Sequence, residues 1–312
     1  MYLAVPGALN YLHGIICTGS IRAVQVRGDT MYAGATSTKF GQFAIAEPLR
    51  FDLLEFHDNT PLKEVEHDIP IPVLDQEDLH KQGIEVTKLV PGAQDTDALG
   101  SCTCNTGTAH IAERWAAAGK DVTGLKLAGG TGAIAMSGTD GTADEEFAIL
   151  LYHLVTDQTG VPSQEWPPTD CGSNGLYVCQ ELIAQGFAAS YKSASNVTAA
   201  IALLQSGTVM QGGPWFNSWM KPDSNGFVDG DGSYEAMRAA VKSGVAGGHE
   251  TLQRGITQLA LTSNGGVDLA NTVIKVRNSW STQFGLNGDY LLHASTLNYL
   301  LKYYDFKAVV LA

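Results

Sequence analysis

The sequence has few basic residues and no long apolar segment. Lys and Arg number 19 against 32 Asp and Glu, which gives a net charge of −13 over 312 residues. No basic stripe is present that would neutralise the phosphates of a nucleic acid, so we expect no nucleic-acid partner. No run of about 18 apolar residues occurs, so we expect no membrane-spanning segment. These absences favour a folded protein that acts on neither nucleic acid nor the membrane interior.

Metal-ligand patterns and cofactor motifs are also scarce. The eight histidines form no His-x-x-x-His pair. The acidic loop that contains Asp223, Asn225, Asp229 and Asp231 does not match the spacing of an EF-hand, which favours a solvated loop over a calcium site. Residues 130–135, Gly-Thr-Gly-Ala-Ile-Ala, resemble a dinucleotide fingerprint but lack a clear βαβ unit and an acidic residue about 20 positions later. We therefore expect no bound metal and no cofactor.

Cysteine is limited to five residues, which are Cys17, Cys102, Cys104, Cys171 and Cys179. An odd number leaves at least one thiol unpaired. Two disulfides are arithmetically possible if Cys102 stays reduced, but a reducing compartment is the simpler interpretation. The first residues also lack the basic start and the cleavage pattern of a signal peptide. We therefore expect the protein in the cytoplasm of the cell that produces it.

The composition is that of a globular protein with room for two lobes. With 44% hydrophobic residues, the chain can bury one large core or two lobes of about 100–150 residues each. Residues 1–58 show apolar alternation around Val24 and Val26, which predicts short strands. Residues 69–72, Ile-Pro-Ile-Pro, indicate an extended link. Helical patterns follow over 85–185, and strands predominate from about residue 196 to the end.

Three short segments carry the chemistry of the chain. They are residues 99–105, Leu-Gly-Ser-Cys-Thr-Cys-Asn, residues 247–249, Gly-Gly-His, and residues 277–280, Arg-Asn-Ser-Trp. Cysteine, then histidine, then asparagine is the chain order of one kind of nucleophilic site. A lone Gly-Ser-Cys more often contains a buried structural cysteine. The three segments together, in this order, favour the nucleophilic site.

Cys102 lies at the start of a predicted helix, which is a position that favours a reactive thiol. Apolar residues after it recur at helical spacing and predict a helix that ends near Gly119; they are Ala109, Ala112, Trp115 and Ala116. The first backbone N–H groups of a helix have no partner inside the helix, so those at Cys102 can stabilise a thiolate and a developing oxyanion. His249 is then expected to exchange the proton, and Asn278 to orient the imidazole. Trp280 is expected to shield that hydrogen bond from water.

These segments resemble those of the papain-like cysteine peptidases, and Gly-Ser-Cys-Thr resembles most the bacterial and viral members. Residues 278–290 are similar to the family stretch Asn-Ser-Trp-Gly-x-x-Trp-Gly-x-x-Gly-Tyr, with Ser281 and Phe284 as substitutions. Residues 145–153 look like the second helix, and residues 207–212 like the strand that opens the second lobe. The resemblance covers roughly residues 60–305.

The resemblance implies an α+β fold with two lobes in a peptidase domain over 59–312. A helical lobe is expected over about 85–185 and a β-rich, barrel-like lobe over about 186–312. The cysteine comes from the first lobe and the histidine from the second. Residues 1–58 lie outside the resemblance, and we expect there a small strand-rich extension that packs on the peptidase or attaches it to a larger assembly.

Three positions depart from the family pattern. The oxyanion glutamine of the family lies six residues before the nucleophile, where this chain has Thr96. A two-residue insertion would make Gln94 the equivalent residue, so we expect Gln94 to assist the backbone N–H of Cys102. A second thiol, Cys104, replaces a small residue. Glu250 follows the histidine where an apolar residue is usual, and it either raises the pKa of the histidine or faces solvent.

The sequence therefore predicts a cysteine peptidase that cleaves peptides or proteins through a thioester acyl-enzyme. One alternative is cleavage of peptidoglycan peptides by a phage or bacterial enzyme associated with the cell wall or with a virion. The other is a structural or virion protein that keeps the fold but has weak catalysis.

Overall fold

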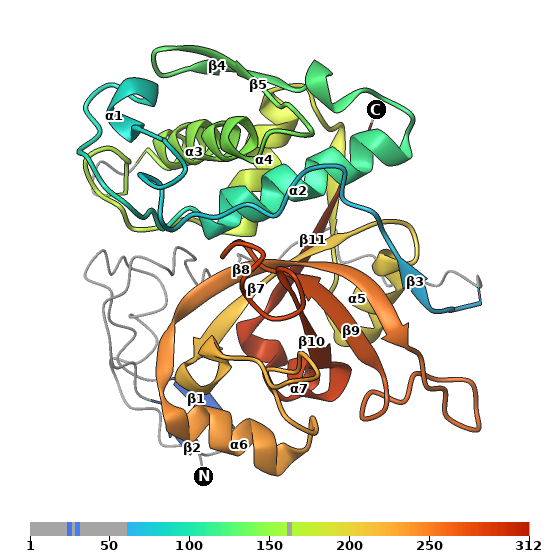
Figure 1. Cartoon of the computed structure of the whole chain (residues 1–312). Coiled ribbons are helices and arrows are strands. Elements are labelled where there is room, and N and C mark those ends of the chain that lie inside the picture. The colour runs from blue at the N-terminus through green and yellow to red at the C-terminus, as the bar shows by residue number, and fades with distance from the viewer. Residues whose placement is uncertain (1–23, 27–28, 32–60, 161–163, 312) are drawn as a thin grey trace.

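The computed structural model describes residues 24–26, 29–31, 61–160 and 164–311. Residues 61–160 and 164–311 together form two lobes (Figure 1). One lobe is built mainly from helices and the other around a sheet. Each lobe has its own cluster of buried apolar side chains. The predicted α+β, two-lobed architecture is therefore confirmed.

In the described residues the helical lobe contains four α-helices, one 3₁₀ helix and a hairpin. In chain order these are α1 (Val86–Leu89), α2 (Cys102–Ala117), the 3₁₀ helix η1 (Val122–Gly124), β4 (Lys126–Gly129), β5 (Gly132–Ala135), α3 (Gly141–Asp157) and α4 (Gly175–Ala184). The side chain of Asp140 accepts hydrogen bonds from the first turn of α3, and that of Asn174 does the same for α4. Because β4 and β5 pair directly, residues 130–135 form a turn and a strand, not a dinucleotide-binding loop.

The core of the helical lobe lies where α2, α3 and α4 pack together. Its fully buried side chains include Ile111 from α2, Phe147 and Leu151 from α3, and Val178 from α4. Burying such side chains contributes about 1.5–3 kcal/mol each. This packing holds the N-terminus of α2 at the lobe boundary.

The second lobe is built on one antiparallel sheet. Its strands are β3 (Val65–Glu66), β6 (Ser190–Ser193), β7 (Val209–Phe216), β8 (Val245–Gln258), β9 (Val273–Arg277), β10 (Asp289–His293) and β11 (Asp305–Val310). They pair in the order β10-β9-β8-β7-β11-β6, with β3 joined to β8. Within the described residues β10 and β6 are the end strands of this order, and outside it Leu291 of β10 forms an isolated bridge with Phe227. The sheet is therefore open, and the barrel-like closure expected from the resemblance is not present in the described residues.

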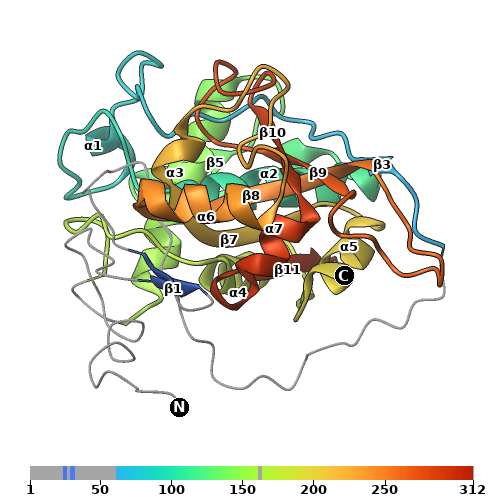
Figure 2. The ribbon, with the colours of Figure 1, turned by 90° about the horizontal axis from the view of Figure 1, so that it is seen from below.

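Three helices of the second lobe were not expected from the sequence. They are α5 (Val197–Leu204), α6 (Tyr234–Ser243) and α7 (Ala294–Tyr299), and two 3₁₀ helices, η2 (Asn217–Met220) and η3 (Leu301–Tyr303), accompany them. Figure 2 shows α5, α6 and α7 around the sheet. Ser233 caps α6 by accepting from Ala236 N, and Gly244 ends it at a φ of +90°. The strands nevertheless form the centre of this lobe, as predicted.

The N-terminal residues that the structure describes form a small hairpin. β1 (Val24–Val26) pairs antiparallel with β2 (Asp29–Met31), which confirms the strands predicted near Val24 and Val26. The rest of the predicted extension over 1–58 lies outside the described residues. In the part of the chain that is described, no helix is both long and apolar enough to cross a membrane.

The lobes are joined by buried polar contacts along α2. Nε2 of His110 accepts a hydrogen bond from Val309 N of β11 at 2.9 Å, and Nδ1 pairs with the hydroxyl of Thr208 at 2.7 Å. Burial lowers the pKa of His110 to about 3, which keeps the ring neutral and able to accept. Thr106 Oγ1 donates to the carbonyl of Glu250 in β8 at 3.0 Å. These contacts fix α2 against the strand that carries His249.

Candidate active site

Cys102 is the first residue of α2, and its side chain is buried. The preceding residue, Ser101, makes no side-chain cap to the helix. Its hydroxyl donates instead to Asn105 Oδ1 at 2.8 Å. The N–H groups at the start of α2 are therefore not capped by Ser101, as required for donors that would stabilise negative charge at Cys102.

The turn before Cys102 is held by a buried carboxylate. Asp170 accepts hydrogen bonds from Gly100 N at 2.9 Å and from the hydroxyl of Tyr152 at 2.7 Å. That hydroxyl in turn accepts from Gly172 N at 2.8 Å. Burial raises the pKa of Asp170 despite these bonds. The network connects the turn before Cys102 to α3 and fixes the backbone that presents Cys102.

A second buried carboxylate holds the first turn of α2. Asn105 Nδ2 donates to both carboxylate oxygens of Glu145, at 2.7 and 2.8 Å. Asp75 N donates to the same carboxylate at 2.9 Å. Burial raises the pKa of Glu145 to about 7, because desolvation of the carboxylate outweighs the hydrogen bonds from Asn105 and from Asp75 N. Through Asn105, Glu145 also positions Ser101.

The structure brings His249, Asn278 and Trp280 together. The Nε2 atom of His249 in β8 lies 2.7 Å from Asn278 Oδ1, just beyond β9. The Trp280 ring stacks on the imidazole at 4.6 Å between centroids, with an interplanar angle of 16°. Trp215 packs its ring edge-to-face on the imidazole at 5.1 Å. The imidazole is thus held by one hydrogen bond and two indole rings, and only 3% of His249 is exposed.

The hydrogen bonds of Asn278 assign the tautomer of His249. Asn278 Oδ1 also accepts from Ser279 N at 2.8 Å, so this atom is the amide oxygen. The Nε2 atom of His249 must therefore carry the proton that it shares with Asn278. Burial lowers the pKa of His249 to about 4, against the opposite effect of the Asn278 bond. At neutral pH the ring is a neutral imidazole whose Nδ1 can accept a proton.

Two expectations for neighbouring residues are wrong. Glu250 neither faces solvent nor raises the pKa of His249, because it is buried against Gly175 at the start of α4 and its own pKa lies well above the ordinary value through burial. Cys171 is disulfide-bonded, so the expectation of a fully reduced protein does not hold. Cys102, Cys104 and Cys179 form no disulfide.

Cys104 belongs to the core of the helical lobe. Burial raises the pKa of its thiol well above the ordinary value. This side chain is therefore a packing group, with little tendency to form a thiolate.

The structure places Gln94 in the loop between α1 and α2, where it is exposed. A different glutamine, Gln76, is fully buried beside the turn before Cys102, and its Nε2 donates to Leu99 O at 3.0 Å. Counting back six to eight residues from Cys102 could not find Gln76, because α1 and its flanking turns lie between them in the chain. Its position after the Ile-Pro-Ile-Pro link carried no sequence signal.

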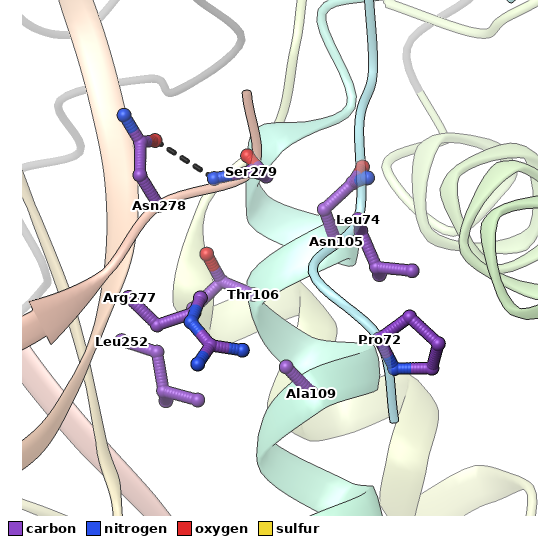
Figure 3. A pocket seen from close by; sticks show the side chains of 9 residues that line it. All are labelled: Pro72, Leu74, Asn105, Thr106, Ala109, Leu252, Arg277, Asn278 and Ser279. Carbon is purple, nitrogen blue, oxygen red and sulfur yellow. Dashed lines mark hydrogen bonds between the residues drawn. The ribbon is translucent and has the colours of Figure 1, made fainter. Parts of the chain in front are cut away.

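A pocket lies next to Asn278, between α2 and the loop after β9 (Figure 3). Asn278 and Ser279 are on one side and Asn105 and Thr106 of α2 on the other. The remaining lining residues are Pro72, Leu74, Ala109, Leu252 and Arg277. Cys102 and His249 do not line it, so this pocket lies beside the candidate reaction centre and not at it. No cluster of His, Cys, Asp and Glu in the described part of the chain is arranged to hold a metal.

Comparison with solved structures identifies the fold. The chain is similar to xylellain, a cysteine protease from Xylella fastidiosa, with a TM-score of 0.53 and 13% identity over 88% of this chain and 97% of that one. It also matches proCathepsin B S9 from Trypanosoma congolense (TM-score 0.46, 13% identity, 86% of each chain). A third match is bromelain from Ananas comosus in complex with the E64 inhibitor (TM-score 0.43, 12% identity, 75% of this chain and 98% of that one). No family model and no curated protein matches the sequence. The fold assignment rests on the similarity to xylellain.

Proposed function

We propose that this chain, which has the papain-like fold, is a cysteine peptidase that hydrolyses peptide bonds with Cys102 as nucleophile. The observation that carries the proposal is the position of His249, which Asn278 orients and Trp280 covers, on the strand whose Glu250 carbonyl accepts from Thr106 in the N-terminal half of α2. A thiol, an imidazole and an amide in these roles form a nucleophilic site.

The first half of the reaction transfers the acyl group to Cys102. The Cys102 thiol gives its proton to His249 Nδ1, and the sulfur forms a bond to the carbonyl carbon of the substrate. The carbonyl oxygen becomes an oxyanion, which the N–H groups at the start of α2 stabilise. His249 then protonates the leaving amine as the C–N bond breaks, which leaves a thioester on Cys102.

The second half releases the acid. His249 takes a proton from water, and the resulting hydroxide attacks the thioester carbonyl. The C–S bond breaks, the carboxylic acid departs, and the proton on His249 returns to the Cys102 sulfur. Asn278 accepts from Nε2 throughout, so Nδ1 always faces the reacting atoms.

Access to the site requires movement. Cys102 has no exposed surface and His249 has 3%. The groups that cover them must therefore be displaced when a peptide binds. The same burial favours the alternative in which the fold is kept but catalysis is weak, so the two functions must be separated by measurement.

Trapping of the acyl-enzyme provides that measurement. Incubation with a peptidyl nitrophenyl ester should add one acyl group to Cys102, detected by mass spectrometry of the digested protein. The Cys104→Ala variant, which lacks the neighbouring thiol, should acquire the same group. No acyl group on Cys102, with an active ester and folded protein, would favour the non-catalytic alternative.

The papain-like fold does not test three further predictions. Gln94 as an oxyanion donor, attachment through residues 1–58, and a location in the cytoplasm or in a virion all stay predictions. Zymography on bacterial cell walls and on casein would separate a peptidoglycan enzyme from a general peptidase.

A further inference from the structure

Gln76 lies between the two halves of the candidate site and bonds to both. Leu99 N donates to Gln76 O at 3.1 Å, and Gln76 Nε2 donates to Leu99 O at 3.0 Å. On the other side, Gln76 N donates to Ser279 O at 3.2 Å, and Ser279 Oγ donates to Gln76 Oε1 at 2.8 Å. Backbone and side chain of one residue thus hold Leu99 and Ser279 together.

Each partner of Gln76 leads directly to a candidate catalytic group. Leu99 belongs to the turn that presents Cys102, three residues further along the chain. Ser279 N donates to Asn278 Oδ1 at 2.8 Å, and the same oxygen accepts from His249. Gln76 therefore connects the nucleophile turn of the helical lobe to the hydrogen bond that orients the imidazole.

Burial makes these bonds costly to lose. Gln76 has no exposed surface, Leu99 has 1% and Ser279 has 5%. Water cannot readily replace a partner at such a place, and each buried polar atom left alone costs about 1–3 kcal/mol. The relative position of the two halves is thereby fixed.

The hydrogen bonds of the Gln76 side chain require an amide group. One end must donate to a carbonyl and the other must accept from a hydroxyl, and an amide provides both on one side chain. A glutamate would turn an acceptor towards Leu99 O, and an alanine would leave both partners alone. The segment around Gln76 is itself anchored, because Asp75 N donates to Glu145.

We propose that Gln76 is a positioning residue that sets the distance and orientation between Cys102 and the His249–Asn278 pair. The proposal rests on the proposed peptidase function and extends it. A displacement of about 1 Å between reacting groups can cost roughly 100-fold in rate, so the loss of this link should reduce turnover more than substrate binding.

The test compares Gln76→Ala, Ser279→Ala and the double variant with the wild type. For Gln76→Ala we expect kcat to fall about 10- to 100-fold, with KM within about threefold. The pH profile of Cys102 alkylation by iodoacetamide should also move towards that of a free thiol. Gln76→Glu should be as impaired as Gln76→Ala. The double variant should lose no more than Gln76→Ala alone, because the two side chains act as one unit.

Gln253→Ala is the matched control. Gln253 is also fully buried, and its amide donates to Gln211 at 2.7 Å in the sheet. This variant should lower Tm while leaving kcat and the alkylation profile unchanged. If Gln76→Ala behaves like Gln253→Ala, Gln76 is only structural and the proposal is wrong. If Gln76→Ala does not fold, the test passes to Ser279→Ala, and an unchanged kcat and alkylation profile in that variant would refute the proposal. An inactive wild type would instead refute the proposed function.

Discussion

Replacement of Asn278 by alanine tests how the imidazole is held. The change removes the acceptor that lies 2.7 Å from His249 Nε2, in a place where both residues are almost fully buried. The N–H of His249 then has no partner, and the ring loses the bond that directs Nδ1 towards the thiol. We expect kcat to fall while KM stays close to the wild-type value, because Asn278 does not contact the substrate in this mechanism.

The size of the effect follows from the contacts that remain. A buried donor left without a partner costs about 1–3 kcal/mol, and about 1.36 kcal/mol corresponds to a tenfold change in rate. The expected loss is therefore roughly 5- to 150-fold. Trp280 still stacks on the imidazole at 4.6 Å and Trp215 still packs against it at 5.1 Å. The ring stays partly oriented, so we expect a loss of about 10- to 100-fold in kcat.

Steady-state kinetics on a fluorogenic peptide amide measures the loss. Asn278→Asp keeps an acceptor, so it should recover most of the rate, and its negative charge should raise the pKa of His249 and move the acid limb of the pH profile to higher pH. Asn217→Ala is the control for the loss of an asparagine side chain away from the site, since it removes an exposed bond to Ser243 O at 2.8 Å. A wild-type rate in Asn278→Ala, or a loss as deep as that of Cys102→Ala, would refute the role of Asn278.

Three other outcomes follow from the same site. Iodoacetamide should modify Cys102 with an apparent pKa below about 8.5. It should modify Cys104 much more slowly, because burial raises the pKa of that thiol well above its ordinary value. Mass spectrometry follows both reactions, and equal titration of the two thiols would argue for a scaffold. His249→Ala should lower kcat by about 10³-fold or more with an unchanged circular dichroism spectrum, and a variant that keeps most of its kcat would exclude His249 as the base. Burial raises the pKa of Glu145 from an ordinary value of 4.5 to about 7 in the folded state, so its contribution to stability is complete below about pH 4.5 and is lost as the pH rises through 7. That contribution amounts to roughly 3 kcal/mol. Urea unfolding at pH 5 and pH 8 should show this loss of stability in the wild type but not in Glu145→Gln. The same pH dependence in both proteins would contradict a raised pKa of Glu145.

The first helix of the helical lobe's core could be predicted because the apolar residues after Cys102 recur at helical spacing, and the second because residues 145–153 resemble a family helix. The helix predicted from Cys102 to near Gly119 spans Cys102–Ala117, and residues 145–153 lie within Gly141–Asp157. The helices of the second lobe are shorter and lie between strands. The eight residues of α5 are almost all apolar, so a buried strand and a buried helix could not be distinguished by period.

The candidate site was predictable where the chemistry is local and not where folding brings distant segments together. Cys102, His249 and Asn278 each lie in a short motif. Gln76 and Glu145 have no such motif, because their partners lie in other elements and their role comes from burial. Gln94 was chosen by spacing along the chain, and spacing does not show which side chains become buried.

The most direct test of the central claim is the peptidase activity of Cys102→Ala. The variant should keep the wild-type circular dichroism spectrum and Tm within a few degrees, and its kcat/KM on a peptide amide should fall by at least about 10³-fold. Such a loss with an intact fold would establish Cys102 as the nucleophile. A folded Cys102→Ala variant that retains most of the wild-type activity would contradict the account.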